Sequence, residues 1–167
     1  ADVTSVSWSP DSTLLAAAGD DGHLHIWQPA TGEETLTINA HADGETVVRW
    51  SPDGALLATG GEDEALVIWD ASSGAPLLAL DDLGSDVTSL AWSPDSRLVV
   101  VATQLADNDD EDAYPLRIWE AATGELRTTL TGPTASVSGL SWSADGQQLA
   151  AGARDGIIFR WDVNDSP

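Results

Sequence analysis

The chain alternates apolar and small polar residues in short runs that are separated by turn residues. In the first forty residues these runs cover 3–8, 14–18, 23–27 and 35–38. A period of two places alternate side chains on opposite faces of a β-strand. The segments between the runs are rich in Pro, Asp and Gly, which favour turns because they preset φ, bond the local backbone or accept positive φ. We therefore predict four short antiparallel strands in this part of the chain, which has no stretch of helical periodicity.

Tryptophan spacing shows that this unit occurs four times. One set of four Trp begins Trp-Ser-Pro-Asp or Trp-Ser-Ala-Asp segments, and a second set follows 19 residues later, or 27 residues later in the third copy. The first set is Trp8, Trp50, Trp92 and Trp142, and the second is Trp27, Trp69, Trp119 and Trp161. The longer spacing indicates one insertion, at 104–115. Four strands in about 42 residues are typical of one β-propeller blade, and we predict blades at 1–38, 45–80, 86–130 and 136–162.

Three segments resemble the WD40-repeat family: Trp50 with 51–54 (Ser-Pro-Asp-Gly), 68–70 (Ile-Trp-Asp) and 122–125 (Ala-Thr-Gly-Glu). The resemblance covers nearly the whole chain and implies an all-β fold of WD40-type β-propeller blades. Residues 1–167 would form a single propeller segment of four-stranded antiparallel sheets, and the last blade would lack its outer strand. The family places the loops from strand d to strand a, and from b to c, on a top face. The a–b and c–d loops lie on a bottom face.

The resemblance also implies a hydrogen-bonded tetrad of His, Ser or Thr, Asp and Trp that holds a blade together. The second repeat matches at all four positions, with His41, Thr59, Asp63 and Trp69. We interpret these residues as structural and expect no catalytic residue among them. The other repeats depart from the tetrad at Ala17, at Leu83 and Val101, and at Pro133 and Ala151.

Four repeats are too few for the seven- or eight-bladed rings that the resemblance implies. Three arrangements stay open at this stage. The chain is part of a longer propeller, two copies pair as a homodimer into an eight-bladed ring, or a different protein caps the ends. Each arrangement predicts an apolar blade-to-blade surface at both ends of the chain. The final run, 157–161, is predicted to be an unpaired strand edge, which favours aggregation where it is uncovered.

Charge and composition narrow the function. The chain has 28 Asp plus Glu against 6 Arg, a net charge of -22 and no Cys. The absence of Cys excludes disulfides, thiolate zinc sites and Cys nucleophiles. The negative charge opposes binding to nucleic acid or to an anionic membrane surface, and we expect neither as a partner. No apolar run approaches the ~18 residues of a membrane span. No signal peptide is visible, so a cytoplasmic location is favoured and an extracellular one stays open.

The insertion in the third repeat is strongly acidic, because five of its residues from 107 to 112 are Asp or Glu. Asp107, Asp109 and Glu111 have the alternate spacing of Ca²⁺ ligands, but the Gly and the terminal Glu of an EF-hand loop are missing. This cation site is therefore a weak candidate and we expect no other metal site. A docking loop for a basic partner and a merely solvated loop are the alternatives. The loop's carboxylates are Asp107, Asp109, Asp110, Glu111 and Asp112.

Further acidic residues belong to the loops that the resemblance assigns to the top face. They are Asp20, Asp43, Glu45, Glu62, Glu64 and Asp86, and Arg154 is the one cation among them. Such a face would attract a basic protein partner. The alternative is a uniformly acidic surface adapted to high salt, because the bottom turns also carry acids. Those acids are Asp11, Asp53, Asp95 and Asp145.

The function predicted from these features is a non-catalytic protein–protein interaction scaffold. The chain has no phosphate-binding Gly loop, no nucleophile elbow and no dense His and carboxylate cluster. His23 and His25 alternate with apolar residues and are expected to face solvent. We expect no cofactor. A structural or assembly subunit, or a sensor module of a larger complex, is the alternative function, and an enzyme is the least favoured class.

Overall fold

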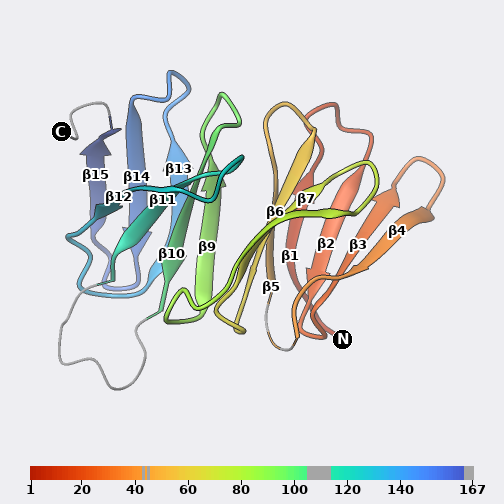
Figure 1. Ribbon diagram of the computed structural model, residues 1–167, viewed down its shortest axis with the longest axis horizontal. Coiled ribbons are helices and arrows are strands. Elements are labelled where there is room, and N and C mark those ends of the chain that lie inside the picture. Colours follow the sequence, from red (N-terminus) through yellow and green to blue (C-terminus); the bar gives the residue numbers. More distant parts are fainter. Residues whose placement is uncertain (43, 45, 105–113, 164–167) are drawn as a thin grey trace.

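The computed structural model describes residues 1–42, 44, 46–104 and 114–163, and these residues form four antiparallel sheets (Figure 1). The first sheet has the strands β1 (Val3–Trp8), β2 (Leu15–Gly19), β3 (His23–Gln28) and β4 (Glu33–Asn39). The second has β5 (Thr46–Trp50), β6 (Leu56–Gly61), β7 (Leu66–Asp70) and β8 (Pro76–Leu80). The third has β9 (Val87–Trp92), β10 (Leu98–Thr103), β11 (Leu116–Glu120) and β12 (Leu126–Leu130). The fourth has β13 (Val137–Trp142), β14 (Gln148–Ala153) and β15 (Ile158–Asp162).

Each sheet is a blade whose strands lie in sequence order, from an inner strand outward. The predicted all-β fold of WD40-type blades is confirmed, including a last sheet of three strands within the described residues. The blades follow one another in a row, with the first and the fourth at opposite ends (Figure 1). The four inner strands, β1, β5, β9 and β13, line up along this row, and each packs against the next. Of the predicted insertion, 105–113 lies outside the described residues.

The turn after each inner strand is closed by one serine and one aspartate. In the second blade, Ser51 Oγ donates a hydrogen bond to Asp53 at 2.6 Å and accepts one from the backbone N–H of Leu56 at 2.9 Å. The other three blades repeat both bonds with Ser9 and Asp11, Ser93 and Asp95, and Ser143 and Asp145. In each turn the serine hydroxyl is the main cause that lowers the pKa of the aspartate. These four carboxylates are therefore engaged within their own turns, as the Asx-type chemistry of the sequence indicates.

The core consists of three apolar clusters, each between two neighbouring blades. Alternation along every strand directs one row of side chains to the preceding blade and the other row to the next. Leu24 and Ile26 of β3 thus pack against Val48 and Leu57 of the second blade. The second and third clusters repeat this arrangement between blades two and three and between blades three and four. The stability of each blade therefore depends on its contacts with neighbouring blades, since an isolated sheet would leave both of its faces uncovered.

Hydrogen bonds between inner strands fix the spacing of the blades. Thr4 Oγ1 donates to the carbonyl of Thr46 at 2.7 Å, and Thr88 Oγ1 donates to the carbonyl of Val137 at 2.9 Å. Ser7 Oγ accepts a hydrogen bond from the backbone N–H of Trp50 at 3.1 Å. Hydroxyl residues of the inner strands therefore join the first blade to the second and the third to the fourth. Between the second and third blades, Trp92 Nε1 donates to the carbonyl of Arg49 at 3.1 Å.

Asp70, at the end of β7, should make the stability of the protein depend on pH. Hydrogen bonds from the hydroxyls and backbone N–H groups of Ser72 and Ser73 lower its pKa to about 2. Because the pKa is lower in the folded state, Asp70 contributes stability above its unfolded value of about 4, and that contribution is lost as pH falls towards 2. Wild type should therefore resist urea better than Asp70→Asn at pH 6, and the difference between their midpoints should shrink from pH 4 to pH 2. A difference that is independent of pH would contradict this assignment.

Candidate functional site

The structure brings the four side chains of the predicted tetrad together. His41 Nδ1 lies 2.8 Å from Asp63 Oδ1, and His41 Nε2 lies 2.9 Å from Thr59 Oγ1. Trp69 Nε1 donates to Thr59 Oγ1 at 2.8 Å. In the tautomer with the proton on His41 Nδ1, the ring donates to Asp63 and its Nε2 accepts the Thr59 hydroxyl proton, while that hydroxyl accepts from Trp69. Asp63 Oδ2 also accepts the backbone N–H of Ala42 at 3.0 Å.

This chain of hydrogen bonds connects the loop before β5 to β6, to the β6–β7 turn and to β7. His41 and Thr59 are buried, and both imidazole nitrogens are engaged. Buried polar networks of this kind rigidify a structure when every member has a partner. The geometry suits a scaffolding role, because neither His41 nor Thr59 is left open to a substrate.

The third blade fills the same space with apolar side chains. Leu83 and Val101 are buried at the positions of His41 and Thr59. The indole nitrogen of Trp119 is buried and has no hydrogen-bond partner among the described residues. Arg117 of β11 donates to the Leu83 carbonyl at 2.8 Å. One blade thus relies on a polar network where its neighbour relies on apolar packing.

Three predicted partner-binding residues meet at the top end of the inner strands. Glu62, Asp86 and Arg154, which come from three different blades, line a hollow of about 190 Å³. The hollow's remaining lining comes from the inner strands and the loops beside them: Thr4, Thr46, Val47, Val87, Thr88 and Gln104. All four blades therefore contribute to one concave site with two carboxylates and one guanidinium.

The other predicted partner-binding residues divide into two groups. Asp20 and Glu64 are described but do not line this hollow. Asp20 instead accepts the backbone N–H of Asp2 at 2.9 Å, and Glu64 accepts the backbone N–H of Leu83 on its carbonyl at 3.0 Å. The second group lies outside the described residues and consists of Asp43, Glu45, Asp107, Asp109, Asp110, Glu111 and Asp112.

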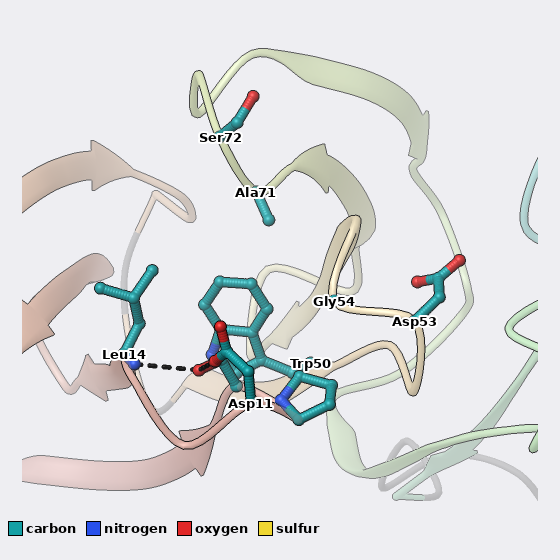
Figure 2. Close-up of a pocket in the computed structure, with 9 residues that line it drawn as sticks. Asp11, Leu14, Trp50, Asp53, Gly54, Ala71 and Ser72 are labelled. Atoms are coloured by element: carbon teal, nitrogen blue, oxygen red, sulfur yellow. Dashed lines mark hydrogen bonds between the residues drawn. The ribbon is translucent and has the colours of Figure 1, made fainter.

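A second hollow, of about 280 Å³, lies at the opposite end of the strands between the first two blades. Figure 2 shows the Trp50 ring between Leu14 on one side and Gly54 on the other, with Ala71 facing the ring. The Asp53 carboxylate points away from the ring and is engaged by the Ser51 hydroxyl. No sequence pattern predicted this hollow, because its lining has no specific chemistry and is brought together only by the packing of the two blades.

The described residues offer neither a metal cluster nor a membrane-spanning helix. In the ranges that the structure describes, no group of three or more His, Cys, Asp or Glu residues could hold a metal ion. The weak Ca²⁺ candidate, with Asp107, Asp109 and Glu111, falls outside those ranges. His25 Nδ1 lies 2.7 Å from Glu34 on the adjacent strand, and the rings of His23 and His25 stack. Within the part of the chain that the structure describes, there is no helix long and apolar enough to cross a membrane.

Comparison with known proteins identifies the repeat. The family model described as WD domain, G-beta repeat matches the chain four times, at residues 1–28, 32–70, 77–109 and 124–162. No curated protein matches the chain. The first match covers β1 to β3, and each later match begins at the outer strand of one blade and continues into the next blade. Together the four matches cover most of the sequence, so the chain belongs to the WD40 repeat family.

Proposed function

We propose that this chain is a non-catalytic scaffold that binds a basic segment of a partner protein at its top face. WD40 repeats in general act in protein–protein interaction. The observation that carries the proposal is the hollow lined by Glu62, Asp86 and Arg154. It is concave, it combines residues from all four blades, and it lies at the end of the inner strands where several acidic loops begin.

Charge determines the class of partner. The chain carries 28 acidic residues against 6 Arg, so its long-range field attracts cations from solution. At the hollow, Glu62 and Asp86 provide two carboxylates for an Arg or Lys side chain, and planar guanidinium groups pair with carboxylates in a bidentate manner. Arg154 lies on the same rim and would donate hydrogen bonds to an acidic group of the same partner. The proposed ligand is therefore a mainly basic peptide segment.

The same scaffold would be part of a larger ring of seven or eight blades. This proposal is supported by the exposed apolar side chains at the two ends of the row, which are Val3, Val6 and Trp8 in the first blade and Ile158 in the fourth. Additional blades from the same chain, a second copy or another protein would cover these faces. The alternative function, a structural or assembly subunit or a sensor module of a larger complex, draws on this same observation.

A peptide titration tests the proposed site. Glu62→Gln combined with Asp86→Asn should weaken the binding of a synthetic Arg-Gly repeat peptide about threefold to tenfold at 0.15 M salt, because two solvent-accessible charge pairs are lost at the rim of the hollow. The affinity of wild type should fall as salt rises. Isothermal titration calorimetry measures both effects.

The control variant removes the same charge elsewhere. Glu33 and Glu125 are exposed residues at the starts of outer-strand segments, and Glu33→Gln with Glu125→Gln changes the net charge by the same amount. Equal weakening in both double variants would show that binding depends on the overall charge, and would reject the hollow as the site.

A further inference from the structure

The two ends of the row of blades carry surfaces that the interior of the molecule uses for packing. We name the head face as the side of the first blade that points away from the second. It is formed by Val3, Val6, Trp8, Leu15, Ala17 and Trp27. The tail face is the side of the fourth blade that points away from the third. It is formed by Gly139, Ser141, Ala150, Gly152, Ile158 and Arg160. These assignments follow from the strand alternation and from the equivalent positions of the inner blades.

The head face repeats a surface that is buried elsewhere. Val6 and Trp8 are 55% and 53% exposed, whereas the equivalent Val48 and Trp50 are 0% and 8% exposed against the first blade. The fourth blade makes the closest comparison, since Trp142, Leu149 and Ala151 occupy the positions of Trp8, Leu15 and Ala17 with the same residue types. Those three residues pack against the tail side of the third blade. The head face therefore has the composition of a surface that accepts a preceding blade.

The tail face has the matching features. Ile158 is 79% exposed, whereas Leu24, Leu66 and Leu116 at the same position of the other blades are fully buried against the next blade. Ser141 occupies the position of Ser7. Because Ser7 Oγ accepts the backbone N–H of Trp50 in the next blade, Ser141 is placed to accept the N–H of the corresponding inner-strand Trp of an incoming blade.

A close contact inside the molecule identifies one point of complementarity. A Cβ added at Gly60 would stand 2.8 Å from the Val87 Cβ of the next blade and closer still to its Cγ1, so the blades meet tightly there. Ala102 and Val137 occupy the same two positions at the following junction. The equivalent glycine on the tail face is Gly152, which has open space where its Cβ would be. The equivalent valine on the head face is Val3, which is 66% exposed.

Charge supports the same pairing. Arg160 lies on the tail face where the other blades have Ile26, Ile68 and Ile118, and it is exposed. A cavity of about 200 Å³ on the head face is lined by Trp27, Asp21 and Glu34, among others. A basic side chain on one face and acidic side chains in a hollow on the other are complementary.

We propose that a second copy of this chain packs its tail face on the head face, and that the same contact formed twice closes a ring of eight blades. Each copy carries both a head face and a tail face, so the tail face of either copy can cover the head face of the other. Such a head-to-tail contact closes into a ring when the rotation between the two copies returns to the starting copy. Ile158 of one copy then packs over Leu15 and Ala17 of the other, and Val3 sits on Gly152. This inference rests on the part of the proposed function that places the four blades in a larger ring.

Mass measurement by light scattering coupled to size exclusion tests the proposal. Wild type at tens of micromolar, well above a micromolar dissociation constant, should have twice the 17.4 kDa mass of one chain. Gly152→Trp should have the mass of a single chain with unchanged far-UV circular dichroism, because the added ring meets open space in one copy and the Val3 region of the other. Ala79→Trp, at an exposed position of the outer strand β8, is the matched control and should remain a dimer.

A charge-exchange cycle provides a second measurement. Arg160→Glu should weaken the dimer about tenfold, and adding Glu34→Arg should recover most of that loss. The control variant, Arg160→Glu with Glu125→Arg, should recover none of the lost affinity, since Glu125 lies away from both faces. Failure of the Glu34→Arg variant to rescue would overturn this pairing of the faces.

The outcomes separate this inference from the proposed function. A wild-type chain of single mass, which would leave the end faces to other blades or to another protein, overturns the two-copy ring. Masses that grow steadily with concentration also overturn it, because they indicate open chains. Binding of the Arg-Gly peptide to the Gly152→Trp variant tests the top face without the ring. If only the ring proposal is wrong, this variant still binds the peptide.

Discussion

Replacing Thr59 by Val should lower the free energy of unfolding by about 2–4 kcal/mol, although the two side chains have nearly the same shape. The Thr59 hydroxyl is fully buried, accepts from Trp69 Nε1 and bonds to His41 Nε2. Valine removes the hydroxyl and leaves two buried nitrogens, Trp69 Nε1 and His41 Nε2, without this partner. Each such group costs about 1–3 kcal/mol. Urea denaturation followed by Trp fluorescence measures the change.

The third blade suggests the control for this experiment. Leu83 and Val101 occupy the His and Thr positions there and pack without a polar network. The double variant His41→Leu with Thr59→Val should therefore be more stable than Thr59→Val alone, because it removes the unpaired His41 nitrogen. Trp69 Nε1 then stays without a partner, as Trp119 Nε1 does in the third blade. If the single variant lost less than about 0.5 kcal/mol, the tetrad would not hold the second blade together.

The strands and the tetrad could be predicted from the sequence because their signals are local or repeated. The period-two pattern predicts strands at 3–8 and 23–27, and the structure has them at Val3–Trp8 and His23–Gln28. Turn residues are equally informative, since the Ser-x-Asp segment after each inner-strand Trp closes its turn by the same hydrogen bond. The tetrad followed from the resemblance to WD40 repeats, whose pattern His41, Thr59, Asp63 and Trp69 match at all four positions.

The top hollow could not be predicted in the same way, because it depends on how the blades are placed in space. Glu62, Asp86 and Arg154 are 24 to 92 residues apart in the chain, yet they share one rim. Asp20 and Glu64, which belong to similar loops, do not line it. The sequence assigns all five residues only to a type of loop. Which of them converge depends on the place of each blade in the row and on the place of each side chain within its turn, since Glu62 and Glu64 belong to the same turn and only Glu62 lines the hollow.

Glycine gives the clearest case of one residue type in two environments. Gly60 and Gly152 occupy the same position of their repeats, ten residues after the inner-strand Trp of each. Gly60 is buried against Val87 of the next blade, while Gly152 faces open space on the tail face. Only the position of the blade in the row makes this difference, so the same substitution should have different effects at the two sites.

Gly60→Val should lower the free energy of unfolding by about 3 kcal/mol, at the upper end of the usual cost of inserting atoms into a packed core. The new side chain must displace Val87, a branched side chain whose Cβ and Cγ atoms are fixed close to the backbone. Gly152→Val should change stability by less than about 0.5 kcal/mol, since it meets no atom and valine favours a strand. Urea denaturation measures both changes, at a protein concentration low enough to keep the protein as single chains.

A compensating variant tests whether the contact with Val87 is the cause. Gly60→Val combined with Val87→Ala makes room at the junction and should recover part of the loss, whereas Val87→Ala alone should be destabilising because it leaves a cavity. Equal destabilisation by valine at residues 60 and 152 would mean that the strand backbone, and not the neighbouring blade, requires glycine. In that case the tight junction between the second and third blades would be no guide to how a further blade packs on the tail face.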